Sequence, residues 1–183
     1  KGLFAHPLAK LLLGTAPAEN RVGRYRLGVP IVETHGRPTV VDIMNGPQIA
    51  WLADGKRLHL NHGPIDLIVE AFGRDAERRR ACEAAIARFG TMLTELVSEL
   101  AELRQPVGAK LRHLAGSTAR RMEVAAQKFH PEFITPMAAV AGAVADEIMA
   151  AMTATADLDK AYVNDGGDIA IHLAPGQSIR AAI

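Results

Sequence analysis

The chain has 183 residues, of which 49% are hydrophobic, and this length accommodates one domain built around a single core. Lysine and arginine number 21 against 20 for aspartate and glutamate, so no overall field draws the protein onto nucleic acid or a membrane, and we expect neither as a partner. The single cysteine, Cys82, excludes an internal disulfide and a cluster of four thiolates, and it favours a reducing, cytoplasmic location.

Residues 1–23 have a weak structural pattern and an excess of basic side chains, and we interpret them as a linker or docking arm. The apolar stretch at 4–13 is interrupted by polar residues and is shorter than the roughly 20 residues of a membrane span, so we expect no span and no signal peptide. The chain opens without a methionine and closes in a strand-like run at 178–183. We therefore expect the domain, residues 24–183, to be incomplete at its C-terminus, with a homodimer or a partner chain covering the sheet edge.

Short strands are predicted in the first half of this domain, where apolar runs alternate with turn residues. The pair Asp54-Gly55 is a strong hairpin signal, because glycine accepts a positive φ without a Cβ clash. We predict a meander of antiparallel strands at 29–34, 39–43, 49–52, 57–60 and 65–71.

Apolar residues recur at three- and four-residue steps from 75 to 103, which predicts one long helix that packs its single apolar face on a sheet. Two shorter helices are predicted at 118–128 and 136–152, the latter with Thr135 as its cap and Pro136 in its first turn. The last helix is rich in alanine, and its small side chains allow close approach to a sheet, another helix or a flat ligand.

A final pair of strands is predicted at 161–164 and 168–173, on either side of Asp165-Gly166-Gly167. Pro175-Gly176 marks a further turn. Strands, then helices, then strands, without βαβ alternation, predict an α+β fold in which antiparallel strands pack against a few helices.

Two segments are candidate ligand-binding sites. Gly166 and Gly167 can expose backbone N–H groups in a concave turn that suits a phosphate or the polar edge of a flat ring; an ordinary hairpin turn is the alternative. The helix start at Thr135 presents N–H groups that attract an anion, and a packed core helix is the alternative there.

A third candidate is the pair His62 and Asp66, which precedes and begins a predicted strand. His62 titrates near neutrality and would act as a proton donor, with Asp66 raising its pKa if the two meet; a turn histidine without chemistry is the alternative. The sequence contains no nucleophile elbow, phosphate loop, dinucleotide-binding motif or Cys-x-x-Cys pair. His59 and His62 are too few for a zinc site, so we predict no metal site.

Two segments resemble the ApbE-like superfamily, and more narrowly its uncharacterised prokaryotic branch: FITPMAAVAG at 133–142 and YVNDGGDIA at 162–170. The best-known members of that superfamily transfer FMN from FAD to a protein threonine, and in them a Gly-Gly-acidic turn lies at the flavin nucleotide. The resemblance therefore implies a flavin, FAD or FMN, bound by Asn164, Gly166, Gly167 and Asp168, with the helix start at Thr135 completing the pocket.

The metal motif of the transferases, a late threonine and aspartate, would lie beyond residue 183, so the resemblance does not imply autonomous FMN transfer by this segment.

The N-terminal part, residues 6–46, resembles the segment that joins a ferredoxin-like part to an ApbE-like part in 6-hydroxynicotinate reductases. Those enzymes reduce a hydroxylated pyridine ring with electrons from ferredoxin through iron–sulfur and flavin centres. The resemblance implies a small aromatic acid as substrate and a ferredoxin or ferredoxin-like domain as partner. It also implies that any iron–sulfur cluster belongs to segments outside this sequence.

Three functional hypotheses follow. The first is a domain of a ferredoxin-linked, flavin-dependent reductase acting on 6-hydroxynicotinate or a similar N-heteroaromatic acid in nicotinate degradation. The second is a flavin transferase-like or flavin-binding protein. The third is a non-enzymatic interaction module whose long helix docks a partner.

Overall fold

The computed structural model describes residues 46–180. The predicted arm at 1–23 and the predicted strands at 29–34 and 39–43 lie outside the described residues, as do the last three positions of the predicted C-terminal strand.

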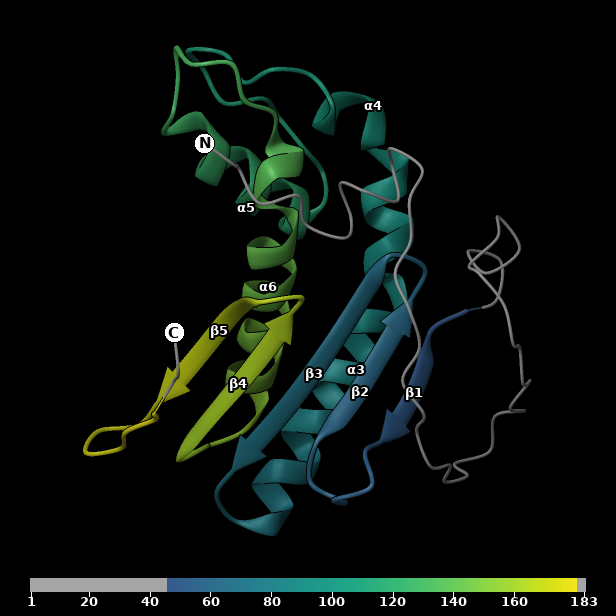
Figure 1. The fold of residues 1–183 in the computed structure, drawn as a ribbon, viewed down its shortest axis with the longest axis vertical. Helices are drawn as coiled ribbons and strands as arrows, with labels where there is room; N and C mark the ends of the chain where they lie inside the picture. The colour runs from purple at the N-terminus through teal and green to yellow at the C-terminus, as the bar shows by residue number, and fades with distance from the viewer. Residues whose placement is uncertain (1–45, 181–183) are drawn as a thin grey trace.

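The described strands form one antiparallel sheet with the order β1-β2-β3-β4-β5 (Figure 1). Each strand pairs with the next strand in sequence, and the helices are inserted between β3 and β4. The predicted meander and the α+β class are confirmed for this part. The strands are β1 Gln48–Trp51, β2 Leu58–His62, β3 Ile65–Phe72, β4 Lys160–Asp165 and β5 Asp168–Leu173.

The turns follow from residues that tolerate tight backbone geometry. Asp54 accepts hydrogen bonds from the backbone N–H groups of Lys56 (2.9 Å) and Arg57 (3.1 Å), which closes the predicted turn between β1 and β2. β2 continues to His62, two residues further than predicted, because Gly63 adopts a φ of 57° and allows a two-residue turn into β3. His62 therefore ends a strand and does not lie in a loop.

The helices begin and end close to the predicted positions. The predicted helix at 75–103 is interrupted at Glu99, whose φ of −110° and ψ of 11° are not helical. Thr135 is the cap residue and Pro136 lies in the first turn, as predicted, but the Thr135 side chain makes no capping hydrogen bond and this first turn is a 3₁₀ turn. The elements are α3 Asp75–Ser98, α4 Leu100–Leu103, α5 Ser117–Gln127, η1 Pro136–Ala139 and α6 Val140–Thr155.

Helices α3 and α6 cover one face of the sheet and pack against each other (Figure 1). Strand residues alternate between this covered face and an open face, and the covered positions such as Leu60, Leu67 and Val163 are fully buried. The small residues of α6 allow this close packing, and Ala143 and Ala145 are buried in the shared core. The core therefore lies between one layer of strands and one layer of helices.

The segment Pro136–Thr155 is long and apolar enough to cross a membrane by length and composition alone. In this domain, however, Val144, Ile148 and Met152 are fully buried in the core that the sheet and the helices share. A core helix of a soluble domain passes the same test, and its burial accounts for its apolar sequence.

Candidate functional site

Two hairpin turns lie at the same end of the sheet. Gly63-Pro64 joins β2 to β3, and Gly166-Gly167 joins β4 to β5; β3 begins where β4 ends, because Leu67 pairs with Asp165. Figure 1 shows both turns at the end of the sheet nearest α5. We call this region, His62–Asp66 together with Asn164–Asp168, the turn end.

Strand alternation sorts the turn-end side chains between the two faces. His62 and Asp165 lie on the covered face and are only 6% and 2% exposed. Asp66 and Asn164 are each adjacent in their strand to a residue on the covered face, so their own side chains point to the open face. The structure thus places buried polar groups on the helix side of the turn end, where water has little access.

Asp165 is the most perturbed acid at the turn end. Burial raises the pKa of its carboxyl to about 8, and the negative charges of Asp66 and Asp168 add to this rise. A hydrogen bond with the backbone of Asp66 acts in the opposite direction but is outweighed. The carboxyl of Asp165 is therefore largely protonated at neutral pH, which allows it to donate a hydrogen bond or a proton.

His62 is a buried neutral imidazole. Burial lowers its pKa, and its ring meets Phe89 edge to face with centroids 6.2 Å apart. Its buried Nδ1 has no hydrogen-bond partner among the described residues. A buried ring nitrogen in this condition has the capacity to bind a further polar group.

The predicted meeting of His62 and Asp66 does not occur in the structure. Asp66 points to the open face, where its carboxylate contacts Nε2 of His59 on the neighbouring strand. The hairpin register causes this, because His62 pairs with Ile65 and the next residue of β3 points the other way. The pKa of His62 is accordingly lowered by burial, not raised by Asp66.

The glycine turn has the geometry that only glycine adopts easily. Gly166 has a φ of 59° and Gly167 a φ of 112°, and a Cβ placed on Gly167 would meet no atom within 4 Å. The backbone N–H of Gly167 donates to Oδ1 of Asn164 at 2.9 Å, so Asn164 closes the turn from within the chain. Asp168 follows on the exposed side. The outer surface at Gly167 is open to a ligand.

Thr135 lies at the start of η1, an element that packs against α5. Its carbonyl accepts a hydrogen bond from the backbone N–H of Ala138 at 3.1 Å. No hydrogen bond joins Thr135 to the glycine turn among residues 46–180, so the two predicted halves of the ligand pocket are not linked by direct bonds.

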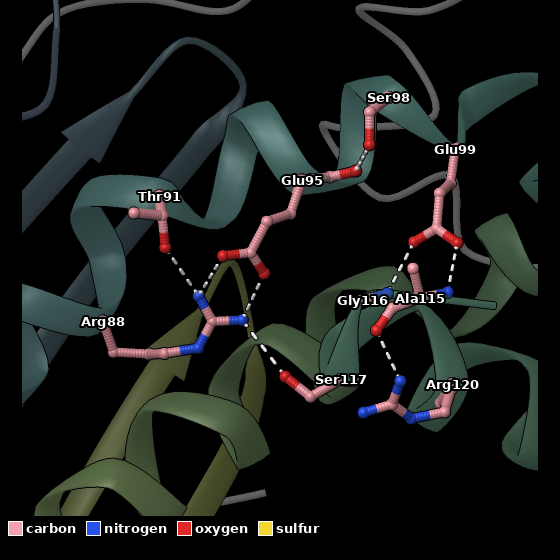
Figure 2. A pocket seen from close by; sticks show the side chains of 9 residues that line it. All are labelled: Arg88, Thr91, Glu95, Ser98, Glu99, Ala115, Gly116, Ser117 and Arg120. Atoms are coloured by element: carbon pink, nitrogen blue, oxygen red, sulfur yellow. Dashed lines mark hydrogen bonds and ion pairs between the residues drawn. The ribbon is translucent and has the colours of Figure 1, made fainter.

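A second polar region, which sequence reasoning missed, lies between α3 and α5 as a pocket of about 510 Å³. Figure 2 shows Arg88 directed at Glu95 and Ser117, while Glu99 faces the N-terminal side of α5. The carboxylate of Glu99 accepts the backbone N–H groups of Ala115 (2.6 Å) and Gly116 (2.8 Å). The pocket is therefore lined by groups that already bind one another.

Arg88 is the centre of this region, with a side chain that is only 17% exposed. Its guanidinium nitrogens donate to Glu147 Oε1 (2.9 Å), Thr91 Oγ1 (3.0 Å), both oxygens of Glu95 (3.0 and 2.7 Å), Ser117 Oγ (3.2 Å) and Thr118 Oγ1 (3.3 Å). Arg121 Nε also donates to Glu147, at 2.7 Å. We call Arg88, Glu95, Ser117, Arg121 and Glu147 the Arg88 network.

The Arg88 network leaves the guanidinium saturated, which indicates a structural role that joins α3, α5 and α6. In the sequence, the only indication of this network is Arg88 itself, which lies beside the apolar stripe of the long predicted helix. Among residues 46–180, no group of three histidine, cysteine or acidic side chains is arranged to hold a metal ion.

The comparisons with known proteins agree with this part of the chain being one unit. A protein-family model described as AbpE bacteria matches residues 49–183, which begin at the second residue of β1 and include all later described strands and helices and both regions above. No curated protein and no solved structure matches the chain. Because the model covers most of the sequence, the chain belongs to the AbpE bacteria family.

Proposed function

We propose that this protein is the ligand-binding domain of a ferredoxin-linked, flavin-dependent reductase that acts on 6-hydroxynicotinate or a similar N-heteroaromatic acid. The ligand edge lies at the turn end, with Gly166, Gly167 and Asp168 on its outer surface. The observation that carries the proposal is the placement of an open glycine turn directly after Asp165, a buried carboxyl with a pKa of about 8.

A protonated carboxyl suits this ligand class. Reduction of a heteroaromatic ring takes up protons together with electrons, and an acid with a pKa near 8 both holds a proton at neutral pH and releases it readily. His62, buried at the adjacent turn with an available Nδ1, supplies a second polar group on the same side of the sheet.

The residues of the turn fit a flavin. The open side of Gly167 lets a flat ring or a phosphate approach the backbone, and Asp168 is exposed beside it. A bound flavin would supply the electron-transfer chemistry, while this chain's residues hold its edge and exclude water. The ferredoxin partner and the cytoplasmic location rest on the resemblance of residues 6–46 and on the single buried cysteine.

Anaerobic titration of the chain with FMN, FAD and 6-hydroxynicotinate, followed by flavin fluorescence and thermal shift, tests the proposal. We expect saturable binding that Gly167→Val weakens by at least about tenfold, because a side chain there both strains the turn and fills the open side. The matched control is Gly55→Val. Gly55 also has a positive φ, 66°, and open space around it, but it lies in the turn at the opposite end of the sheet.

The outcomes separate the hypotheses. Loss of binding in Gly167→Val but not in Gly55→Val supports the turn end as the site. Binding of FAD without any binding of the aromatic acid would favour a flavin transferase-like or flavin-binding protein instead. Absence of binding to all three compounds would leave an interaction module as the better description.

A further inference from the structure

Strand β5 forms one border of the sheet, and among residues 46–180 no strand pairs with its outer edge. Three aliphatic side chains of β5 stand on the open face: Ile169, Ile171 and Leu173, which are 50%, 44% and 42% exposed. Exposed edges are usually guarded by lysine, proline or a bulge, and none of these interrupts residues 169–173. An unguarded aliphatic edge favours association with another strand.

The backbone of β5 directs its hydrogen-bonding groups in a fixed alternation. The two-residue turn makes Asp165 and Asp168 a hydrogen-bonded pair, so the even-numbered residues of β5 bond to β4. At the far end the backbone N–H of Ala174 donates to the carbonyl of Asp159 at 2.9 Å, in agreement with this alternation. The N–H and C=O groups of the three aliphatic residues therefore point outward.

The outward-facing backbone groups and the aliphatic side chains of β5 are arranged symmetrically about Ile171. If a second antiparallel copy of β5 is placed on a two-fold axis there, Ile171 meets Ile171, and each Ile169 meets the other copy's Leu173. A shift by one residue would oppose outward groups with inward groups, which breaks the ladder. A shift by two would leave either the two Leu173 side chains or, in the other direction, the two Ile169 side chains opposite turn residues and without an aliphatic partner. One register alone matches both the backbone and the side chains.

We propose that a second copy of this chain pairs with the outer edge of β5, in the register centred on Ile171. The two five-stranded sheets then form one continuous antiparallel sheet, and the aliphatic stripes of both copies cover each other. No charged side chain lies within the stripe, so the two-fold arrangement opposes no like charges. This inference does not rest on the proposed function, and it brings each Pro175-Gly176 turn toward the other copy's Gly166-Gly167 turn.

Cysteine crosslinking tests the register. Cys82 is buried and is the only native cysteine, so a single introduced thiol on the open face reports on the edge. Ile171→Cys should form a disulfide-linked dimer under mild oxidation, because residues on the axis lie within disulfide reach across a hydrogen-bonded pair. Ile169→Cys is the matched control. It should crosslink at least about tenfold less alone, yet crosslink readily when mixed with Leu173→Cys.

Sedimentation of the unmodified chain supplies the second measurement. We expect a dimer of twice the 19.6 kDa chain mass, and Ile171→Lys should convert it to a monomer with an unchanged melting profile of the domain. A native chain that stays monomeric at about 100 μM would overturn the proposal. Equal crosslinking of Ile171→Cys and Ile169→Cys would overturn it as well, since that result indicates random collision.

Discussion

The Arg88 network and the turn end both bury ionisable groups, but they treat those groups in opposite ways. Burial acts to raise the pKa of Glu147, but hydrogen bonds from Ser117, Arg121 and Arg88 together outweigh burial. The net result is a lowered pKa. At the turn end burial raises the pKa of Asp165 to about 8, and the nearest charges, Asp66 and Asp168, are negative. The network therefore keeps its carboxylate charged, whereas the turn end keeps its carboxyl neutral.

This difference supports our proposal that the Arg88 network serves stability and that the turn end binds the ligand. A buried ion pair with saturated hydrogen bonds holds helices together, and its groups have no capacity left for a ligand. A buried acid near negative charges lowers the stability of the fold as it ionises, and such an arrangement is typical of a functional site. The following predictions test this distinction, from the largest expected effect to the smallest.

Glu147→Ala should destabilise the domain by about 3–5 kcal/mol, because it leaves the buried Arg88 without part of its compensation. Urea unfolding followed by circular dichroism measures the effect. The control is Asp146→Ala, an exposed neighbour on the same helix, which should change stability by less than about 0.5 kcal/mol. Equal effects of the two variants would show that the Arg88 network is not a stabilising unit.

Asp165→Asn should stabilise the domain at alkaline pH. The pKa of Asp165 is about 8 in the folded state, which is above its value in the unfolded state. Between these two pKa values the folded state binds one more proton than the unfolded state, so stability falls as pH rises from about 4 to 8. The slope approaches about 1.4 kcal/mol per pH unit, and the asparagine variant removes it. The advantage of the variant should therefore be greatest at pH 8 and smallest at pH 4.

Thermal and urea unfolding of the parent and of Asp165→Asn across that range measure the difference. Asp159→Asn, an exposed aspartate just before β4, serves as the control and should leave the slope unchanged. A parent profile with no fall in stability between pH 4 and 8 would contradict a buried, protonated Asp165.

His62→Leu should be neutral or stabilising by up to about 1 kcal/mol at pH 7.5, because it removes a buried nitrogen that makes no hydrogen bond within residues 46–180. The pKa of His62 is lowered by burial, so its contribution is present above the unfolded pKa and is lost as pH falls through the folded value. The His62→Leu variant should therefore gain stability relative to the parent as the pH is lowered to 5. A loss above about 2 kcal/mol at pH 7.5 would indicate an intramolecular role for the imidazole.

Tyr162→Phe on the open face should cause a small loss of stability, about 0.5–1 kcal/mol. The tyrosine hydroxyl donates to Glu70 Oε2 at 2.9 Å, and burial together with Glu70 raises its pKa to about 12. Urea unfolding at pH 7 measures the loss. An effect as large as that of Glu147→Ala would mean that the open face is stabilised as strongly as the helix layer.

Much of the fold could be predicted from local patterns. The period-two runs, the glycine turns and the long apolar stripe from residue 75 specify strands and helices through short-range chemistry, and the structure agrees within a few residues. The interruption at Glu99 was not predictable from the stripe, because its carboxylate is drawn to the backbone of Ala115 and Gly116, far along the chain.

The site was predicted less completely, for a physical reason. The glycine turn is a local feature, and its position between two strands was predicted, but the faces occupied by His62 and Asp66 depend on the hairpin register. The importance of Asp165 depends on burial under helices, and the Arg88 network joins residues as far apart as Arg88 and Glu147. Such properties arise only when distant segments pack together.

The central claim is that ligands bind at the turn end and not in the Arg88 pocket. The most direct measurement is an anaerobic titration with FMN and 6-hydroxynicotinate followed by two-dimensional NMR of the ¹⁵N-labelled chain. We predict that the shifted amides cluster at residues 62–66 and 164–168, while Glu95, Ser98 and Gly116 stay unchanged. Shifts confined to the Arg88 pocket would contradict the account and place binding in the region assigned here to stability.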